Sequence, residues 1–171
     1  MLVKTLLRRV IPRAFRLKLL HRLRRLRYPA RLGTLRRTSP LSDYWGSDRG
    51  TPVDRYYIDN FIGEHGRDIH GRVLEIKDMQ YTERFGCNVR RSDVLDVDPG
   101  NNAATIVADL AAADAVASNC FDCVILTQTL QLVYDTRAAL THVHRILRPG
   151  GVVLVTVPTM SQLASNTKPW C

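Results

Sequence analysis

Residues 121–158 read FDCVILTQTLQLVYDTRAALTHVHRILRPGGVVLVTVP, and this stretch decides the fold. Near its two ends lie apolar runs, DCVILT at 122–127 and VVLVTV at 152–157, which predict buried strands. Between them Asp135 is expected to cap a helix that the Arg148-Pro149-Gly150-Gly151 turn closes. The apolar face of that helix is expected to be Ala139, Leu140, Val143, Ile146 and Leu147. A strand, a helix and a strand at this spacing indicate a right-handed crossover between parallel strands.

Three more apolar runs lie upstream of this unit. We expect strands at 72–76 (RVLEI), 92–98 (SDVLDVD) and 104–107 (ATIV). A helix is expected to begin at Thr51-Pro52-Val53-Asp54, with Thr51 as its cap, and to end near Gly63 or Gly66. Its apolar side is expected to be Val53, Tyr57, Ile58, Phe61 and Ile62. The alternation predicts a doubly wound α/β fold with a mostly parallel, Rossmann-like sheet of about five strands.

The chain has 171 residues, of which 45% are hydrophobic and 24% charged. This length suits one domain plus an arm and excludes two full domains. The net charge of +9 is uneven, because residues 1–37 hold 13 of the 25 Lys and Arg and no acid, which leaves the rest at −4. We therefore expect a basic arm (residues 1–37), a linker or ordered loop (38–50) and a domain (51–171).

The basic arm carries an apolar stripe at helical spacing, which Pro12 interrupts. The stripe consists of Val3, Leu7, Val10, Ala14, Phe15, Leu19, Leu23 and Leu26. A basic amphipathic helix suits an anionic surface, and the apolar stripe favours a membrane over a nucleic acid. Two alternatives stay open: the arm packs on the domain, or it is a mitochondrial targeting segment.

Other function classes are excluded or disfavoured. No apolar run reaches the 18 or more residues of a membrane span, and arginines interrupt every candidate secretory segment. We expect a cytoplasmic chain that can be peripheral to a membrane. Its four cysteines are expected to be free thiols, and the Cys120/Cys123 pair alone predicts no metal site.

Three acids follow successive predicted strands: Glu75, Asp98 and Asp109. Ligands of doubly wound sheets bind beyond the carboxyl ends of the strands, and an acid after the second strand suits the hydroxyls of a ribose. These acids therefore predict a cradle for an adenosine-bearing ligand. The alternatives are structural, because Asp98 opens the turn sequence Asp98-Pro99-Gly100-Asn101 and Asp109 can cap the Ala-rich segment after it.

The segment from Gly71 to Pro158, about half of the chain, resembles the class I S-adenosylmethionine-dependent methyltransferases of the type 11 kind. The resemblance rests on GRVLEI, VLDVDPG, IVADL, FDCVILTQTLQLVYD and HRILRPGGVVLVTVP. It implies S-adenosylmethionine as cofactor and methyl transfer as activity. It also implies that Glu75 orients the cofactor loop, that Asp98 holds the ribose and that Asp109 with Leu110 meets the adenine. Thr127 and Gln128 would line the methionine end.

The sequence departs from the family pattern at two places. The glycine-rich turn after the first strand, typically ExGxG, reads Glu75-Ile76-Lys77-Asp78-Met79-Gln80, so Lys77 and Met79 stand where glycines would approach the cofactor. The helix after this turn is expected to be a single turn, 81–85. After Val157 only 14 residues remain for the helix and the antiparallel strand pair with which the family's sheet continues.

These observations predict methyl transfer to a small-molecule or carbohydrate acceptor, with the arm at a membrane surface. Two alternatives stay open: a catalytically inactive methyltransferase-like binding module, and a nucleic-acid methyltransferase that uses the arm. No spacing singles out a catalytic base. The sequence specifies neither the methyl acceptor nor the oligomeric state.

Overall fold

The computed structural model describes residues 48–158 continuously, and before them only Leu19, Arg22, Leu23, Leu26, Ser42 and Gly46. The chain divides into two compact units, residues 1–56 and 57–171, and α3 (Val53–Glu64) crosses the division. In the first unit Leu19, Leu23 and Leu26 are helical and exposed. The other residues of the predicted arm stripe lie outside the described residues.

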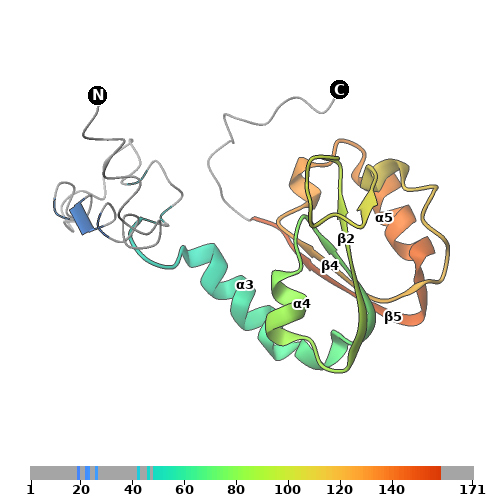
Figure 1. Ribbon diagram of the computed structural model, residues 1–171, viewed down its shortest axis with the longest axis horizontal. Helices are drawn as coiled ribbons and strands as arrows, with labels where there is room; N and C mark the ends of the chain where they lie inside the picture. Colours follow the sequence, from blue (N-terminus) through green and yellow to red (C-terminus); the bar gives the residue numbers. More distant parts are fainter. Residues whose placement is uncertain are drawn as a thin grey trace. The chain divides into compact units, whose positions relative to one another are not determined.

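The second unit is built on a five-stranded sheet whose neighbouring strands are all parallel (Figure 1). The strands are β1 (Gly71–Ile76), β2 (Val89–Asp96), β3 (Ile106–Val107), β4 (Phe121–Thr127) and β5 (Leu147–Thr156). Their order across the sheet is β3-β2-β1-β4-β5. The chain thus builds outward from β1 in one direction and then returns to the other side, so the strand order reverses between β1 and β4. This confirms the predicted doubly wound α/β fold.

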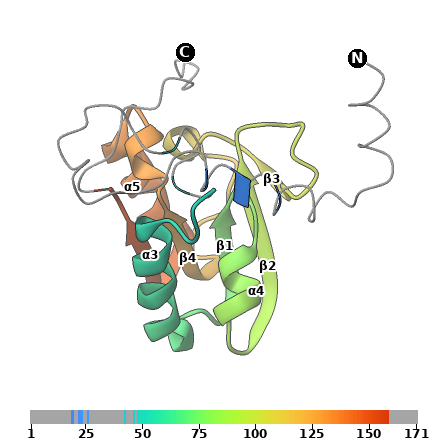
Figure 2. The same ribbon diagram turned by 90° about the vertical axis from the view of Figure 1, so that its left-hand side faces the viewer.

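Helices cover both faces of the sheet (Figure 2). On one face α3 and α4 (Gln80–Phe85) pack Ile58, Ile62 and Tyr81. These side chains meet Val73 of β1 and Cys123 and Ile125 of β4. On the other face α5 (Thr136–Ile146) and the short helix η3 (Leu110–Ala112) complete a second core around Phe121. Single 3-10 turns, η2 (Gly66–Asp68) and η4 (Leu130–Leu132), complete the second unit. This double cover explains why the strands are apolar on both sides.

The predicted crossover between β4 and β5 is confirmed in outline. Asp135 caps α5 by accepting a hydrogen bond of 2.8 Å from the amide of Ala138. Ala139, Val143 and Ile146 are buried, whereas Leu140 is 44% exposed, so its assignment to the core face was wrong. It lies at the margin of the apolar stripe, where the helix surface turns toward solvent.

The first helix also exposes residues that we assigned to its apolar side. Val53 and Tyr57 are 73% and 67% exposed, while Ile58 and Ile62 are buried. The helix begins at Val53, and the carbonyl of Pro52 accepts the amide of Tyr56 at 3.1 Å. Only the turns that face the sheet contribute to the core.

The bounds of β2, β3 and β5 differ from the prediction. β2 covers 89–96 rather than 92–98, because Val89 and Arg91 already pair with the start of β1. β3 keeps only two of its four predicted residues. β5 begins at Leu147, which pairs with Phe121, whereas the next pair is Cys123 with Val152. The residues 148–151 therefore form an excursion within the strand instead of a turn that ends the helix.

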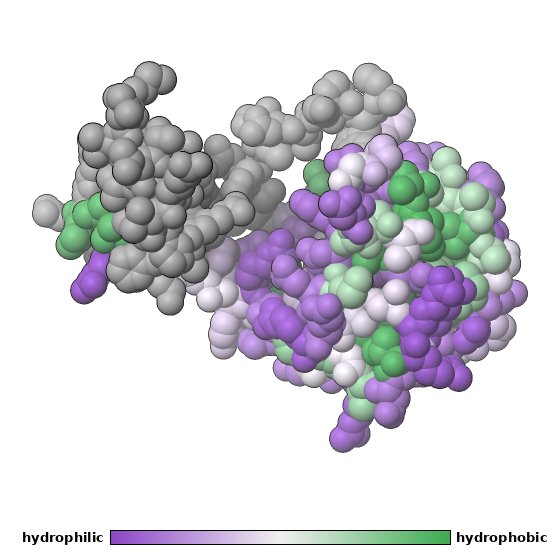
Figure 3. Space-filling view, in the orientation of Figure 1, coloured by the Kyte–Doolittle hydropathy of each residue, from purple (hydrophilic) through white to green (hydrophobic). Residues whose placement is uncertain are grey.

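Polar side chains cover most of the visible face of the second unit, with apolar patches between them (Figure 3). None of the helices among the described residues is both long and apolar enough to cross a membrane.

Cys123 is fully buried in β4, and burial raises the pKa of its thiol to about 12. Within residues 48–158 and the isolated positions, no three His, Cys, Asp or Glu gather into a metal site.

Candidate cofactor site

The candidate site lies at the carboxyl ends of β1 and β4, where the strand order reverses. Pairing between these two strands ends at Glu75 and Ile125, although β1 continues to Ile76 and β4 to Thr127. The strands therefore lose contact at their carboxyl ends. In doubly wound sheets this is the place where ligands bind.

Glu75 fixes the loop that leaves β1. Its side chain is 2% exposed, and its carboxylate accepts the amides of Tyr81 at 3.0 Å and Thr82 at 2.9 Å. The hydroxyl of Thr82 donates a third bond of 2.8 Å. Burial raises the pKa of the Glu75 carboxyl, and the three hydrogen bonds partly oppose this shift. The carboxylate thus ties the end of β1 to the first turn of α4, and the loop between them has both ends held.

Lys77 occupies a backbone conformation that favours glycine. Its φ is 74°, in the left-handed region, and it stands at the first glycine position of the family's turn. Its amide bonds the carbonyl of Leu95 at 3.0 Å, which holds the backbone in place. Met79, at the second glycine position, has φ −116° and needs no glycine. At Lys77 the backbone has the left-handed conformation that suits the glycine of the family's turn. Glycine would adopt this conformation without strain, whereas lysine does not.

Asp96 and Asn101 also lie at this edge of the sheet, and neither was predicted from the sequence. Asp96 is the last residue of β2, and its Oδ2 accepts the side-chain amide of Asn101 at 2.6 Å. The same Asn101 nitrogen lies 2.7 Å from the carbonyl oxygen of Lys77. One amide therefore joins the loops after β1 and β2. The signal was present in the sequence, because Asp96 also follows an apolar run, but the turn-forming residues after Asp98 suggested a later strand end.

Asp98 and Asp109 lie at the same edge as Glu75, and each is engaged within its own loop. Asp98 is exposed, and its Oδ1 accepts the amide of Gly100 at 2.8 Å. Asp109 is exposed and caps η3 by accepting the amide of Ala111 at 2.9 Å. Leu110 is 3% exposed and packs in the core beneath this loop. The structure places the three acids on one rim but joins none of them to another.

Thr127 and Gln128 lie at the end of β4, on the other side of the strand-order reversal from Glu75 and Lys77. Thr127 pairs with Thr156 of β5 and is half-buried. Gln128 has a φ of 52°, and its carbonyl accepts the side-chain amide of Gln131 at 2.8 Å. Lys77 and Gln128 thus place left-handed residues after the two strands that flank the reversal. Backbone strain of this kind, at residues other than glycine, is found most often at functional sites.

The comparison with known families decides which class of protein this is. The family described as a methyltransferase domain matches residues 68–155, which is just over half of the chain and includes β1 to β4 and all of β5 except its last residue. The chain belongs to this methyltransferase family. This confirms the predicted family, and S-adenosylmethionine is the cofactor of this class of domain. A comparison with curated proteins gave no match.

Several solved structures are similar to the chain. The [4+2]-cyclase SpnF has a TM-score of 0.48 and 19% identity, over 62% of this chain and 45% of that one. An S-adenosylmethionine-dependent methyltransferase from Mesorhizobium loti has a TM-score of 0.48 and 16% identity, over 64% and 55%. The trans-methyltransferase CalH, solved with SAH, has a TM-score of 0.44 and 15% identity, over 63% and 40%. The chain spans about half the length of these proteins.

The residues at this edge fit an adenosine-bearing cofactor. Asp96 and Asp98, at and after the end of β2, supply acceptors for hydroxyl groups, and the loop after β1 is held by Glu75 and by Asn101. Lys77 is the main departure, since it is exposed and carries a long side chain where glycine would let a ligand approach the backbone. The Lys77 side chain therefore stands where the family pattern has no side chain.

Proposed function

We propose that this methyltransferase domain transfers a methyl group from S-adenosylmethionine to a small-molecule or carbohydrate acceptor, and that the basic arm brings it to a membrane surface. The main support for the cofactor site is the loop after β1, which Glu75 and Asn101 fix beside the strand-order reversal. Such a preformed loop loses little conformational entropy of its own when a ligand binds.

Each residue has a role in this proposal. Glu75 holds the loop, Asp109 and Leu110 border the adenine, and Thr127 with Gln128 borders the methionine end. An acid after β2 binds the ribose, and Asp96 is a second candidate for this role beside Asp98. Asp96 closes the strand and is partly buried, while Asp98 lies two residues further in an exposed turn.

The cofactor, when bound, supplies an activated methyl group on its sulfonium. The domain's contribution is then to hold an acceptor oxygen in line with that methyl group and to exclude water. Positioning of this kind is worth up to roughly 7–11 kcal/mol. Gln128 and Gln131 already hydrogen-bond each other at the end of β4 and can orient an acceptor hydroxyl. A strong general base is not required for this displacement.

The experiment for the transfer step uses methyl-labelled S-adenosylmethionine with the full chain and a panel of sugar and phenolic acceptors. We expect label in an acceptor of one class and a loss of transfer in Gln128→Ala. Label that appears only in RNA would overturn the acceptor class that we propose. No label in any acceptor, with intact cofactor binding, would favour the binding module described next.

A specific observation favours the second candidate, a catalytically inactive binding module. Lys77 keeps the left-handed φ of the family's glycine without being glycine. If the site is vestigial, Lys77→Gly should raise the affinity for S-adenosylmethionine several-fold. If the site is in use, the lysine belongs to it, and the same substitution should leave the affinity unchanged or lower it. Met79→Gly is the control, because its backbone does not need glycine.

The basic arm supports the membrane part of the proposal. Leu19, Leu23 and Leu26 are spaced as one helical stripe, and all three are exposed. The arm has no acid, so anionic lipid attracts it along its whole length. A nucleic acid would satisfy its charges but would leave the leucines in water.

A further inference from the structure

The second unit is electrically polarised from one end of its sheet to the other. Most of its basic residues lie at the amino-terminal edge of the strands: Arg67, Arg72, Arg90, Arg91, Arg145 and Arg148, with the acids Glu64, Asp68, Asp93 and Asp122. The carboxyl-terminal edge, which holds the candidate cofactor site, is acidic. It carries Glu75, Asp78, Asp96, Asp98, Asp109 and Asp135 against Lys77 and Arg137. The cofactor site does not use the basic edge.

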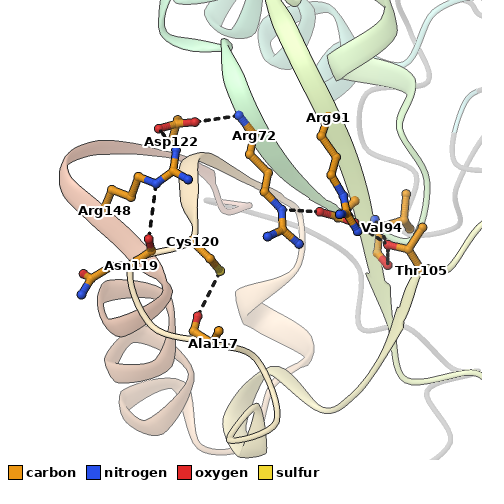
Figure 4. Close-up of polar contacts among 10 residues, drawn as sticks. Arg72, Arg91, Val94, Thr105, Ala117, Asn119, Cys120, Asp122 and Arg148 are labelled. Carbon is orange, nitrogen blue, oxygen red and sulfur yellow. Dashed lines mark hydrogen bonds and ion pairs between the residues drawn. The ribbon is translucent and has the colours of Figure 1, made fainter.

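Some arginines of the basic edge are engaged in the fold (Figure 4). Arg72 donates to Asp93 at 2.7 Å, and Arg148 donates to Asp122 at 2.6 Å. Arg90 is 3.7 Å from the same Asp122, and its side chain is 77% exposed. These contacts pair the Asp93 and Asp122 carboxylates with arginines and leave the Arg90 guanidinium largely in solvent.

A hollow of about 560 Å³ opens on this edge. Two short segments line it: residues 67–71, with Arg67 from η2 and His70 and Gly71 at the start of β1, and residues 87–90, with Cys87, Asn88 and Arg90 around the start of β2. Among the described residues, the side chains of Arg67 and His70 have no hydrogen-bond or ion-pair partner. No acid lines the hollow.

The backbone of the hollow is fixed. Gly71 has a φ of 66°, and a Cβ at this position would collide with the Asp122 carboxylate. Its amide donates to the carbonyl of Asn88 at 3.1 Å, and the amide of Cys87 donates to the carbonyl of Ile69 at 2.8 Å. The hollow is therefore held between β1 and β2 in the way that a preorganised binding site requires.

We propose that this hollow binds the phosphate group of a phosphorylated ligand, with Arg67 and Arg90 as the main cationic contacts. Guanidinium groups present planar pairs of donors that match phosphate oxygens, and His70 offers a further ring nitrogen. No Phe, Tyr or Trp side chain lines the hollow to stack on a nucleic-acid base. The phosphate thus belongs to a small phosphate ester or to a lipid headgroup rather than to a single-stranded nucleic acid. The proposal is independent of the cofactor site, because S-adenosylmethionine carries no phosphate.

The test is a titration of the isotope-labelled full chain with inorganic phosphate, followed residue by residue in amide spectra. We expect saturable shifts at Gly71, Asn88 and Arg90, and a dissociation constant that rises at least fivefold in the double variant R67Q/R90Q. Arg137→Gln is the matched control, since it removes one exposed arginine at the opposite edge and should leave the constant unchanged. The residue-by-residue readout separates the hollow from the basic arm, which also attracts phosphate.

Two further arms identify the source of the phosphate. Phosphatidylcholine vesicles with and without phosphatidylinositol phosphate are compared between the wild-type chain and R67Q/R90Q. A several-fold loss of binding in the variant would assign a lipid headgroup, and an unchanged affinity together with saturable phosphate shifts would assign a small ester. Shifts confined to the arm, shifts that persist in R67Q/R90Q, or a response of the hollow to RNA but not to phosphate would each overturn the proposal.

Discussion

At the scale of single residues, the backbone of Lys77 is the most informative feature. Its φ of 74° is one that lysine adopts only at a cost, because the Cβ crowds the neighbouring carbonyl. Met79, two residues on, has an ordinary φ of −116°. The sequence revealed that both glycines were replaced, but it could not reveal that only one of them was needed by the backbone.

Lys77→Gly is therefore expected to raise the free energy of unfolding by about 1 kcal/mol, since it relieves the left-handed conformation. Met79→Gly should lower it by up to about 1 kcal/mol, since it only adds freedom to the unfolded chain. Urea denaturation of the two variants measures the difference. Equal stability of the two variants would show that the turn is not strained at Lys77.

Glu75 gives a prediction on pH. Burial raises the pKa of its carboxyl, so the folded chain holds this proton more tightly than the unfolded chain. The contribution of Glu75 to stability should therefore fall as pH rises from its ordinary pKa of 4.5 to the raised pKa of the folded chain. Unfolding free energies of the wild-type chain and of Glu75→Gln, compared across this range, isolate the effect. If the unfolding free energy of the wild-type chain instead increased relative to that of Glu75→Gln as pH rises, this prediction would be wrong.

At the scale of elements, charged residues near strand ends account for the main errors in prediction. The expected strand at 92–98 left out Arg90 and Arg91, yet β2 begins at Val89, because its first residues lie at the edge of the sheet where long side chains reach water. The apolar centres of β1, β2, β4 and β5 were predictable because burial on both faces leaves no other pattern. Asp96 was missed for the same reason as the strand bounds, since β2 ends where Asp96 pairs with Val107 of β3, and the local sequence does not show this pairing.

Arg72 and Arg91 give a prediction at this scale, because both donate to the buried Asp93 carboxylate. Arg72 is 30% exposed and lies over the Phe121 ring, with its central guanidinium carbon 4.7 Å from the ring centroid, whereas Arg91 is 63% exposed. Arg72→Gln should destabilise the domain by about 1–3 kcal/mol. Arg91→Gln should cost under about 1 kcal/mol. Thermal unfolding ranks the two variants, and a reversed order would contradict this assignment.

The contacts of Arg72 and Arg91 with Asp93 determine how the stability of the domain changes at acid pH. Burial alone would raise the pKa of Asp93, but the hydrogen bonds from Arg72 and Arg91 and their charges lower it below its ordinary 3.8. The stability that this carboxylate contributes is present above pH 3.8 and is lost as pH falls through the lowered pKa. Arg72→Gln should move this loss to higher pH.

At the scale of the whole molecule, the chain combines a methyltransferase domain with an arm of opposite charge. Deletion of residues 1–37 should abolish binding to anionic vesicles at low salt. Leu19→Ser with Leu23→Ser should weaken it several-fold without a change in charge, because the leucine stripe enters the lipid. Sedimentation with vesicles measures both. If the leucine substitutions have no effect while RNA binds with a steep salt dependence, the arm is a nucleic-acid element.

The rim after β1 and β2 is proposed to hold S-adenosylmethionine. Calorimetric titration of the full chain with this cofactor is the most direct test. We predict saturable binding that weakens at least tenfold in Asp96→Asn or Asp98→Asn, whichever acid binds the ribose, and that stays unchanged in Arg137→Gln. The absence of heat at millimolar cofactor in a folded chain, or equal binding in all variants, would contradict the account.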